Sequence, residues 1–152
     1  MIQRALIVDD DLGMQRTVAR EILKSYQVVL ASAGEEAMAI LARGDGIRAV
    51  VCDRDLGPGP DGLQVLGRAM ELDPTCARIL ITGGITDEVA EEAIRSKVAH
   101  YVFIKPWERG ELVRAVQRIL SGASLEDDQP TQSEVRTMSH RIVRSEWERK
   151  LA

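Results

Sequence analysis

Acidic, hydroxyl and ammonium side chains stand directly after four short apolar runs of the chain, and together they could handle a phosphoryl group. Carboxylates held close together repel one another, and burial would protonate them unless a cation is bound. Magnesium prefers oxygen ligands of this kind, and phosphoryl transfer depends mainly on positioning and on neutralising the phosphoryl oxygens. A lysine can contact a phosphoryl oxygen, and an aspartate carboxylate can act as the nucleophile. The residues concerned are Asp9, Asp10, Asp11, Asp53, Asp55, Thr82 and Lys105.

Five apolar runs, with helix-like segments between them, must position these residues. The runs show no polar alternation, which is typical of strands covered on both faces of a parallel sheet. Between them, apolar residues recur at three- and four-residue spacing, as in Met14, Val18 and Ile22, which indicates amphipathic helices. The alternation predicts an α/β fold with a five-stranded, doubly wound parallel sheet over roughly residues 2–121. The runs are 5–8, 28–31, 49–52, 79–81 and 101–104.

The carboxyl ends of parallel strands meet at one edge of a sheet, and ligands of open α/β sheets bind there. The first run ends before the three consecutive acids, and the third ends at Asp53. The fourth ends at Thr82 and the fifth before Lys105. We therefore expect the carboxylates, the hydroxyl and the ammonium group to converge on this edge.

Length and composition narrow the class of protein. A chain of 152 residues that is 45% hydrophobic can bury the core of one domain and is not disordered. Its 20 basic and 24 acidic residues give a net charge of −4 without a basic block, so direct nucleic-acid binding is not expected. No apolar run approaches the ~18 residues of a membrane span, and the first residues do not resemble a signal peptide. With only Cys52 and Cys76 available, we expect a cytoplasmic protein without a disulfide framework.

Six short motifs lie at or near the ends of the expected strands. They are Leu6-Ile7-Val8-Asp9-Asp10, Ala31-Ser32-Ala33-Gly34-Glu35-Glu36-Ala37, Val51-Cys52-Asp53, Asp61-Gly62-Leu63, Ile81-Thr82-Gly83 and Ile104-Lys105-Pro106-Trp107. In this order and spacing, they resemble the receiver domain of the bacterial response regulators, the phosphoacceptor half of two-component signalling. A single motif of this length is weak evidence, whereas the ordered set at strand ends is specific. The resemblance implies a flavodoxin-like receiver fold.

The resemblance also implies a metal and acceptor site. Asp53 resembles the aspartate that is phosphorylated, and it would also contact Mg²⁺. Asp10 resembles the direct magnesium ligand, and Asp9 would support the metal through water. Asp55 stands where the family uses a main-chain carbonyl as a metal ligand, so its side chain need not bind.

The other residues of the edge would contact and sense the phosphoryl group. Lys105 resembles the lysine that contacts acceptor and phosphoryl group, and Thr82, followed by Gly83, resembles the switch hydroxyl. The Lys105–Pro106 peptide bond would be cis. The phosphoryl group would come from a phosphohistidine of a sensor kinase or a phosphotransfer protein. The protein would not be an enzyme for an external metabolite, and it would catalyse only its own phosphorylation and dephosphorylation.

Three positions depart from the family pattern. The stretch 56–60, before Asp61, is one residue longer than the commonest receiver loop. Val102 stands where the family usually has a switch Tyr or Phe, and strand alternation would turn the flanking Tyr101 and Phe103 to the opposite face. Asp11 is a third acid where a pair suffices, and we expect it to face solvent or to start the first helix.

An alternative from another class is a phosphatase of the haloacid-dehalogenase type. Such enzymes use an Asp-x-Asp motif after the first strand, here Asp9 and Asp11, with Asp9 as nucleophile. Two features oppose it: there is no acid pair at a further strand after Lys105, and the usual Gly-Thr is missing after Asp11. The phosphatase would carry the acyl phosphate on Asp9, and the receiver would carry it on Asp53.

Beyond the expected sheet the composition changes. We assign residues 1–121 to the receiver domain, 122–132 to a polar linker and 133–152 to an amphipathic helical tail. Val143, Trp147 and Leu151 recur at helical spacing in the tail, among basic residues. The tail could pack on the receiver, form a homodimer or precede an output domain. An output domain or partner protein would contact the face made by the fourth helix, the fifth strand and the fifth helix.

Overall fold

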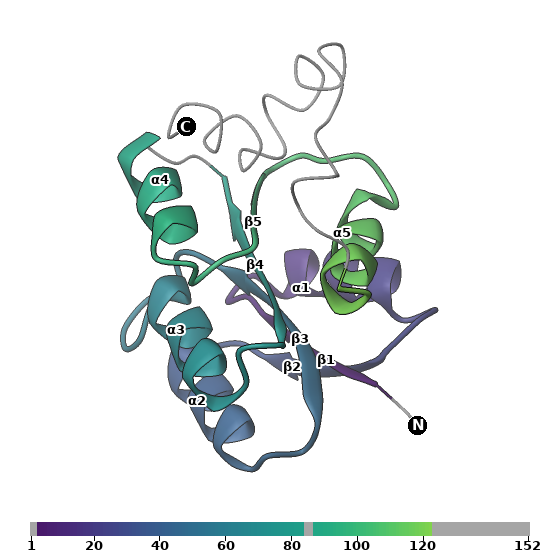
Figure 1. The fold of residues 1–152 in the computed structure, drawn as a ribbon, viewed down its shortest axis with the longest axis horizontal. Coiled ribbons are helices and arrows are strands. Elements are labelled where there is room, and N and C mark those ends of the chain that lie inside the picture. The colour runs from purple at the N-terminus through teal and green to yellow at the C-terminus, as the bar shows by residue number, and fades with distance from the viewer. Residues whose placement is uncertain (1–2, 84–86, 123–152) are drawn as a thin grey trace.

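Five parallel strands form one sheet in the order β2-β1-β3-β4-β5 (Figure 1). The computed structural model describes residues 3–83 and 87–122. Each apolar run identified in the sequence lies within a strand, so the predicted five-stranded parallel sheet is confirmed. The strands are β1 (Arg4–Val8), β2 (Gln27–Ala31), β3 (Ile47–Asp53), β4 (Ala77–Thr82) and β5 (Tyr101–Ile104).

Helices cover both faces of the sheet, as a doubly wound fold requires (Figure 1). One apolar cluster lies between the sheet and α2, α3 and α4, and a second lies between the sheet and α1 and α5. Successive residues of β1, β3 and β5 contribute mainly to the two clusters in turn, which explains their continuous apolar runs. The helices are α1 (Leu12–Ile22), α2 (Gly34–Ala42), α3 (Gly62–Leu72), α4 (Asp87–Arg95) and α5 (Glu111–Leu120).

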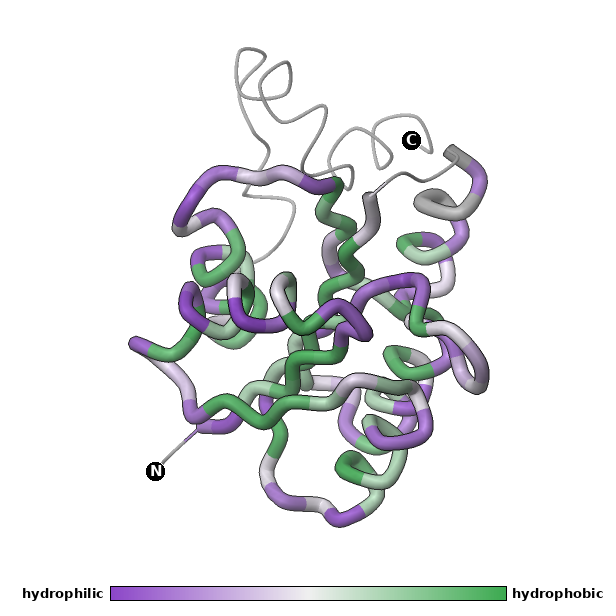
Figure 2. The backbone as a smooth tube through the Cα atoms, turned by 180° about the vertical axis from the view of Figure 1, so that it is seen from behind, coloured by the Kyte–Doolittle hydropathy of each residue, from purple (hydrophilic) through white to green (hydrophobic). Residues whose placement is uncertain are grey.

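The hydropathy of the chain follows this layering, with the hydrophobic segments concentrated in the central strands (Figure 2). Val50, Leu80 and Val102 are fully buried in the cluster under α2, α3 and α4. The helical spacing of Leu63, Leu66 and Met70 in the sequence predicts the apolar stripe of α3. Of these three residues Leu66 is fully buried, together with Val65 and Ala69, which the spacing did not include. Leu63 is only partly buried at the margin of the cluster.

The direction of winding reverses between β1 and β3. From β1 the chain first adds β2 on one side, and it then returns to place β3, β4 and β5 on the other. Val8 and Cys52 are register partners, so Asp9 and Asp53 follow neighbouring strands at the same level. A reversal of this kind leaves a crevice at the carboxyl ends of the two strands, because their connections leave in opposite directions.

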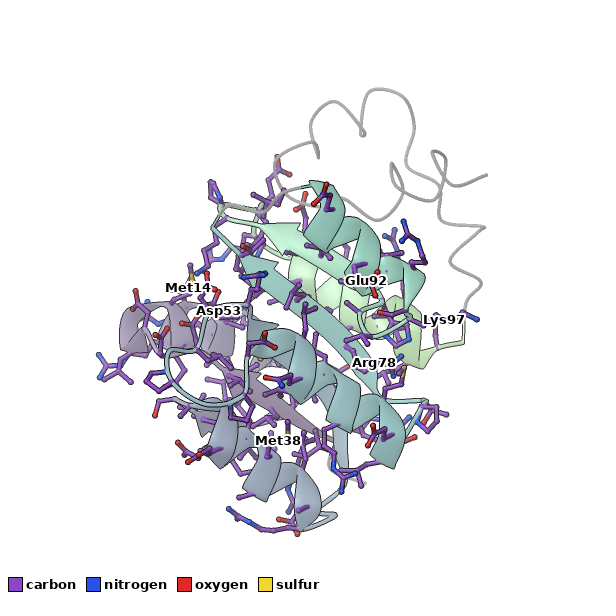
Figure 3. All side chains as sticks on the ribbon, turned by 90° about the vertical axis from the view of Figure 1, so that its left-hand side faces the viewer. Met14, Met38, Asp53, Arg78, Glu92 and Lys97 are labelled. Atoms are coloured by element: carbon purple, nitrogen blue, oxygen red, sulfur yellow. The ribbon has the colours of Figure 1, made fainter. Side chains whose placement is uncertain are left out.

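Arg78 is a buried charge that the apolar pattern of β4 did not predict. Its guanidinium group donates hydrogen bonds of 2.8–3.0 Å to the carbonyls of Pro74, Cys76, Lys97 and Val98. Burial lowers the pKa of this arginine, although the carbonyls satisfy its donors. Arg78 and Lys97 lie toward one end of the molecule and Asp53 toward the other (Figure 3). Arg78 therefore joins β4 to the turn before β5, away from the acidic residues.

The predicted linker and helical tail, residues 122–132 and 133–152, lie outside the described residues, apart from Gly122. Among the helices of the described part, none is long and apolar enough to cross a membrane.

Candidate functional site

Three carboxylates meet at the crevice between β1 and β3. Asp9 and Asp10 follow β1, and Asp53 is the last residue of β3. Each offers an oxygen within 4.8 Å of the oxygens of the other two. Asp9 and Asp53 are buried, whereas Asp10 is exposed at the mouth of the crevice. The structure thus brings together three of the residues that the sequence singled out.

Burial and neighbouring carboxylates raise the pKa values of Asp9 and Asp53. Burial is the main reason that the pKa of Asp9 rises to about 6, and the nearby carboxylates of Asp53 and Asp10 raise it further. The backbone N–H of Asp11, which donates to Asp9 Oδ1 at 2.9 Å, and the ammonium group of Lys105 oppose the rise. The pKa of Asp53 is also raised, again chiefly by burial.

The donor set suits a hard divalent cation. Neighbouring carboxylates contribute to the raised pKa values of Asp9 and Asp53, and a bound cation can offset this repulsion without protonation. Mg²⁺ prefers oxygen ligands and usually keeps several bound waters, so it suits a site of carboxylates that is open to solvent on one side. Asp9, Asp10 and Asp53 therefore fit a magnesium ion.

Lys105 provides a positive charge on the other side of Asp53. Its Nζ lies 3.3 Å from Asp53 Oδ1, and the interaction with Lys105 lowers the pKa of Asp53 against the effect of burial. The backbone N–H of Lys105 donates to the Thr82 carbonyl at 2.9 Å, which links the ends of β4 and β5. The Lys105–Pro106 peptide bond is cis, the isomer that the resemblance implies. Asp53 is thus close both to the acids Asp9 and Asp10 and to the ammonium group of Lys105.

Thr82 ends β4 and is buried, while the adjacent Gly83 is exposed. The register pairs Thr82 with Ile104, the residue before Lys105. The carboxyl ends of β3, β4 and β5 therefore present an acid, a hydroxyl and an ammonium group side by side.

The remaining acids have other partners. Asp11 is the N-cap of α1, and its side chain accepts hydrogen bonds from the backbone N–H groups of Gly13 and Met14. This confirms the expectation that it starts the first helix. The Asp55 side chain is 82% exposed and pairs with Arg54 at 3.1 Å, so it points to solvent.

The aromatic residues of β5 lie away from this edge. Val102 is fully buried under α2, α3 and α4. Tyr101 and Phe103 belong to the cluster under α1 and α5, as strand alternation predicts. Phe103 packs edge to face against Trp107, with ring centroids 5.8 Å apart. No aromatic side chain of β5 is therefore placed to follow a movement of Thr82.

The loop after β3 is closed by a backbone contact between its two ends. Gly57 and Gly59 have φ of 73° and 96°, a region that favours glycine. At its end, the Gly62 N–H donates to the Arg54 carbonyl at 3.1 Å, and a Cβ at Gly62 would collide with the Asp53 carbonyl. Asp61 and Gln64 then form a capping box that starts α3. We call residues 56–61 the β3–α3 loop.

Two polar residues of α1 support the edge, and the sequence analysis missed both. Gln15 is buried, and its side-chain amide donates to the carbonyls of Ala31, at 2.9 Å, and Asp9, at 3.4 Å. Gln15 lies on the apolar face of α1, near Met14 and Val18, and a polar residue at such a position indicates a buried hydrogen bond. Glu21 accepts three hydrogen bonds from the segment after Lys105. No local sequence pattern predicted these contacts, since the partners are more than 80 residues apart.

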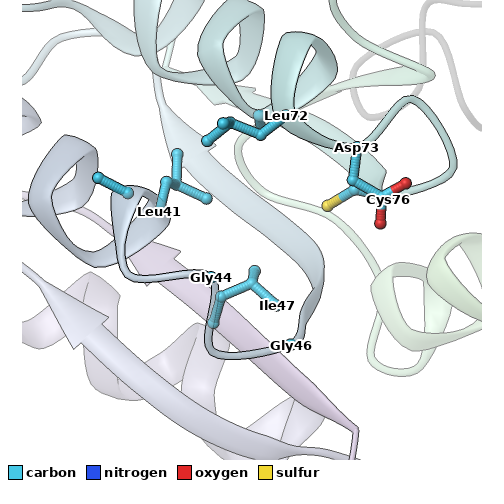
Figure 4. Close-up of a pocket in the computed structure, with 9 residues that line it drawn as sticks. Leu41, Gly44, Gly46, Ile47, Leu72, Asp73 and Cys76 are labelled. Atoms are coloured by element: carbon cyan, nitrogen blue, oxygen red, sulfur yellow. The ribbon is translucent and has the colours of Figure 1, made fainter.

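A separate pocket of about 270 Å³ lies between the ends of α2 and α3 and the starts of β3 and β4 (Figure 4). Leu41, Ile47 and Leu72 provide its apolar wall, and Cys76 and Asp73 stand at one side. Burial raises the pKa of the Cys76 thiol to about 12, which makes it a poor nucleophile. The pocket is at the opposite edge of the sheet from Asp53 and does not contribute to the acidic site.

Comparisons with known proteins agree with this geometry. The family model of the response regulator receiver domain matches residues 5–117. The sporulation initiation phosphotransferase F of Bacillus subtilis is 30% identical over 123 residues, which are 79% of this chain and 95% of that protein. A response regulator receiver protein of Sinorhizobium medicae superposes with a TM-score of 0.71 at 27% identity, covering 79% of this chain and 95% of that one.

One relative is much longer than the chain. The hydrogenase transcriptional regulatory protein HoxA of Cupriavidus necator is 28% identical over 123 residues, which are 81% of this chain. The match spans only 25% of that regulator. The similarity to it is thus confined to one part of a larger protein.

Proposed function

Because the chain belongs to the response regulator receiver domain family, we propose that it is a phosphorylation-controlled switch whose acceptor is Asp53. Receiver domains are signalling modules of two-component systems and not classical enzymes. The observation that carries the proposal is the ion pair of 3.3 Å between Lys105 and Asp53, in a crevice that also holds Asp9 and Asp10. The lysine pairs with Asp53 and not with Asp9, which favours the receiver over a haloacid-dehalogenase-type phosphatase.

The transfer we propose moves one phosphoryl group. An oxygen of Asp53 forms a bond to phosphorus while the bond between phosphorus and a donor histidine nitrogen breaks, and the histidine leaves with that electron pair. A bound Mg²⁺ would offset the charge of the carboxylates and of the phosphoryl oxygens. Asp10 and Asp53 would hold it directly, Asp9 through water and Asp55 through its main-chain carbonyl. Lys105 would exchange its contact with the carboxylate for one with a phosphoryl oxygen.

The donor in the cell would be the phosphohistidine of a sensor kinase or phosphotransfer protein. The name of the Bacillus relative, a sporulation initiation phosphotransferase, supports a place in a phosphoryl-transfer chain. The partner that reads the switch, whether an output domain or a separate protein, would contact the surface of α4, β5 and α5. Such partners would place the protein in the cytoplasm, and residues 133–152 could contribute a homodimer contact.

Mapping the acyl phosphate tests the proposal. The full chain is incubated with acetyl phosphate and Mg²⁺, the acyl phosphate is reduced with borohydride to homoserine, and the modified residue is identified by peptide mass spectrometry. We expect homoserine at position 53. Homoserine at position 9 would instead establish the phosphatase chemistry, and no modified residue with or without Mg²⁺ would refute both.

Thr82→Ala is expected to separate phosphorylation from switching. The variant should still accept phosphate, because the hydroxyl is not the nucleophile, and it should transmit the change poorly because no hydroxyl can move toward the phosphoryl group. Amide exchange over residues 83–107, with and without beryllofluoride, measures the transmitted change. Thr82→Ser keeps a hydroxyl and is the matched control. A protection change in Thr82→Ala equal to that of Thr82→Ser would contradict a role for the hydroxyl.

Lys105→Ala is expected to lower the rate of phosphorylation and also the protection change. The substitution removes the ammonium group that lies 3.3 Å from Asp53 Oδ1, leaving the metal as the only strong positive charge at the acceptor. We expect an initial rate about tenfold to a hundredfold lower at saturating Mg²⁺. Stopped-flow kinetics with a small phosphoryl donor measure it. A rate equal to that of a surface variant such as Lys97→Ala would exclude the role.

A further inference from the structure

A single carboxylate on α1 fastens the segment that follows Lys105. Oε1 of Glu21 accepts hydrogen bonds from the backbone N–H groups of Gly110, at 2.8 Å, and Leu112, at 3.2 Å. Its Oε2 accepts from the indole N–H of Trp107, at 3.0 Å. Glu21 is half-buried and stands next to Ile22, the last residue of α1. The β5–α5 connection and the first turn of α5 are therefore attached to α1 by three hydrogen bonds.

This carboxylate also serves as the cap of α5. The helix begins after Gly110, which has φ of 90° and provides no side chain to accept the first N–H groups. Helix N-termini attract negative charge, because their N–H groups are unpaired and carry the positive end of the helix dipole. Glu21 provides that charge from another helix, since its Oε1 accepts the N–H groups of Gly110 and Leu112.

The attachment joins the two halves of the phosphorylation site. α1 begins at Leu12, two residues after Asp10, and the attached segment follows Lys105. Phe103 precedes Lys105 by two residues and packs against Trp107, so the same indole is held from both sides. A shift of this segment relative to α1 would move Lys105 relative to the carboxylates.

We infer that Glu21 is a positioning residue for phosphoryl transfer: by fastening the β5–α5 connection to α1, it keeps the ammonium group of Lys105 at Asp53. It touches neither the acceptor nor the metal-binding acids and acts only through the backbone and Trp107. The inference rests on the proposed function for its kinetic consequence, but not for the mechanical coupling between Glu21 and Lys105.

The test compares Glu21→Gln with Glu71→Gln in the full chain. Glutamine has the same shape as glutamate, but its NH₂ group cannot accept the hydrogen bonds that one carboxylate oxygen receives. Glu71 lies on α3, on the other face of the sheet, in an exposed pair with Arg68, so its variant is a control for loss of one charge. Three quantities are measured: hydrogen exchange of single amides, Mg²⁺ affinity, and the phosphorylation rate with acetyl phosphate at saturating Mg²⁺.

The backbone N–H of Lys105 is the decisive probe. It donates to the Thr82 carbonyl and has no direct contact with Glu21, so its exchange reports a transmitted effect. In Glu21→Gln we expect the Lys105 amide to exchange about tenfold faster. The phosphorylation rate should fall about tenfold, with the Mg²⁺ dissociation constant within about twofold of wild type. Glu71→Gln should match wild type in all three.

Two results would overturn the inference. One is faster exchange at Gly110 and Leu112 with unchanged exchange at Lys105 and an unchanged phosphorylation rate, which describes a cap without a positioning role. The other is faster exchange throughout β1 and β3 with weaker Mg²⁺ binding, which describes general destabilisation. If Glu21→Gln does not fold, Trp107→Phe, which removes one of the three donors and keeps the ring, is expected to give the same pattern at about threefold.

Failure of the proposed function would look different. If wild-type protein takes up no phosphate, the phosphorylation proposal is refuted, and the exchange of the Lys105 amide alone decides the inference. Faster exchange at Lys105 in Glu21→Gln would then support the coupling, and unchanged exchange would refute it.

Discussion

Asp53→Asn should abolish phosphorylation by acetyl phosphate in the presence of Mg²⁺. The asparagine amide that replaces the carboxylate is uncharged and is a poor nucleophile. Among the described residues, no other carboxylate forms an ion pair with Lys105 and could take its place. We expect the initial rate to fall below about one hundredth of the wild-type rate. Intact-mass spectrometry over a time course, with and without a chelator of Mg²⁺, measures the loss.

Asp55→Asn is the matched control, because it removes the same charge two residues away. Its side chain is 82% exposed and pairs with Arg54, and in the function proposed above only its main-chain carbonyl would contact the metal. This variant should therefore remain phosphorylatable and Mg²⁺-dependent. Equal phosphorylation of Asp53→Asn and Asp55→Asn would show that the acceptor has been misassigned.

Asp9→Asn should make the metal-free protein more stable at neutral pH. The pKa of Asp9 is raised to about 6 in the folded protein from an ordinary value of 3.8, so the folded state binds the proton more tightly than the unfolded state. The free energy of unfolding therefore falls as the pH rises from about 4 to about 6, and it stays lower above that window. This shift corresponds to about 3 kcal/mol at pH 7, and urea denaturation of the metal-free variant should recover up to that amount.

The response to pH and to metal distinguishes this effect from ordinary stabilisation. At pH 4 the gain should largely vanish, because Asp9 is then protonated in the folded wild-type protein. Mg²⁺ should stabilise wild type and stabilise Asp9→Asn much less, since binding to the folded state is the source of the stabilisation. Asp11→Asn is the control: asparagine caps helices as well as aspartate does, so its stability should change by less than about 0.5 kcal/mol. A destabilised Asp9→Asn at pH 7 without metal would contradict the electrostatic account.

The fold and most of the site could be read from the sequence because both depend on local patterns. A strand buried on both faces must be apolar throughout, and runs such as 49–52 are short enough to exclude a long helix. Parallel strands bring their carboxyl ends to one edge, so Asp53 and Lys105 could be brought together without knowledge of their distance. A helix cap also depends on residues close in sequence, so the position of Asp11 at the start of α1 could be predicted.

What the sequence did not predict depends on contacts between distant segments. Arg78 lies within a buried strand because four carbonyls accept hydrogen bonds from its guanidinium group. Two of them, those of Lys97 and Val98, belong to a segment about 20 residues further along the chain. Glu21 looks in the sequence like an ordinary polar residue of an amphipathic helix, although it accepts three hydrogen bonds from the β5–α5 connection and the first turn of α5. The apolar face of α3 was predicted only in part: Leu66 is buried as expected, whereas Leu63 is partly buried and Val65 fully buried, a difference that only the packing decides.

The backbone contact that closes the β3–α3 loop determines where residues can be inserted without disturbing the acidic site. Asp53 and Gly62 are held together by the hydrogen bond between Gly62 and Arg54 and by a close approach that leaves no room for a Cβ. A change in the length of this loop is thus confined between two fixed ends and need not move Asp53. Insertions at Gly57 or Pro58, both exposed, should be tolerated, whereas any side chain at Gly62 should not. This makes the loop a natural place to graft a short peptide or a label that reports on the crevice.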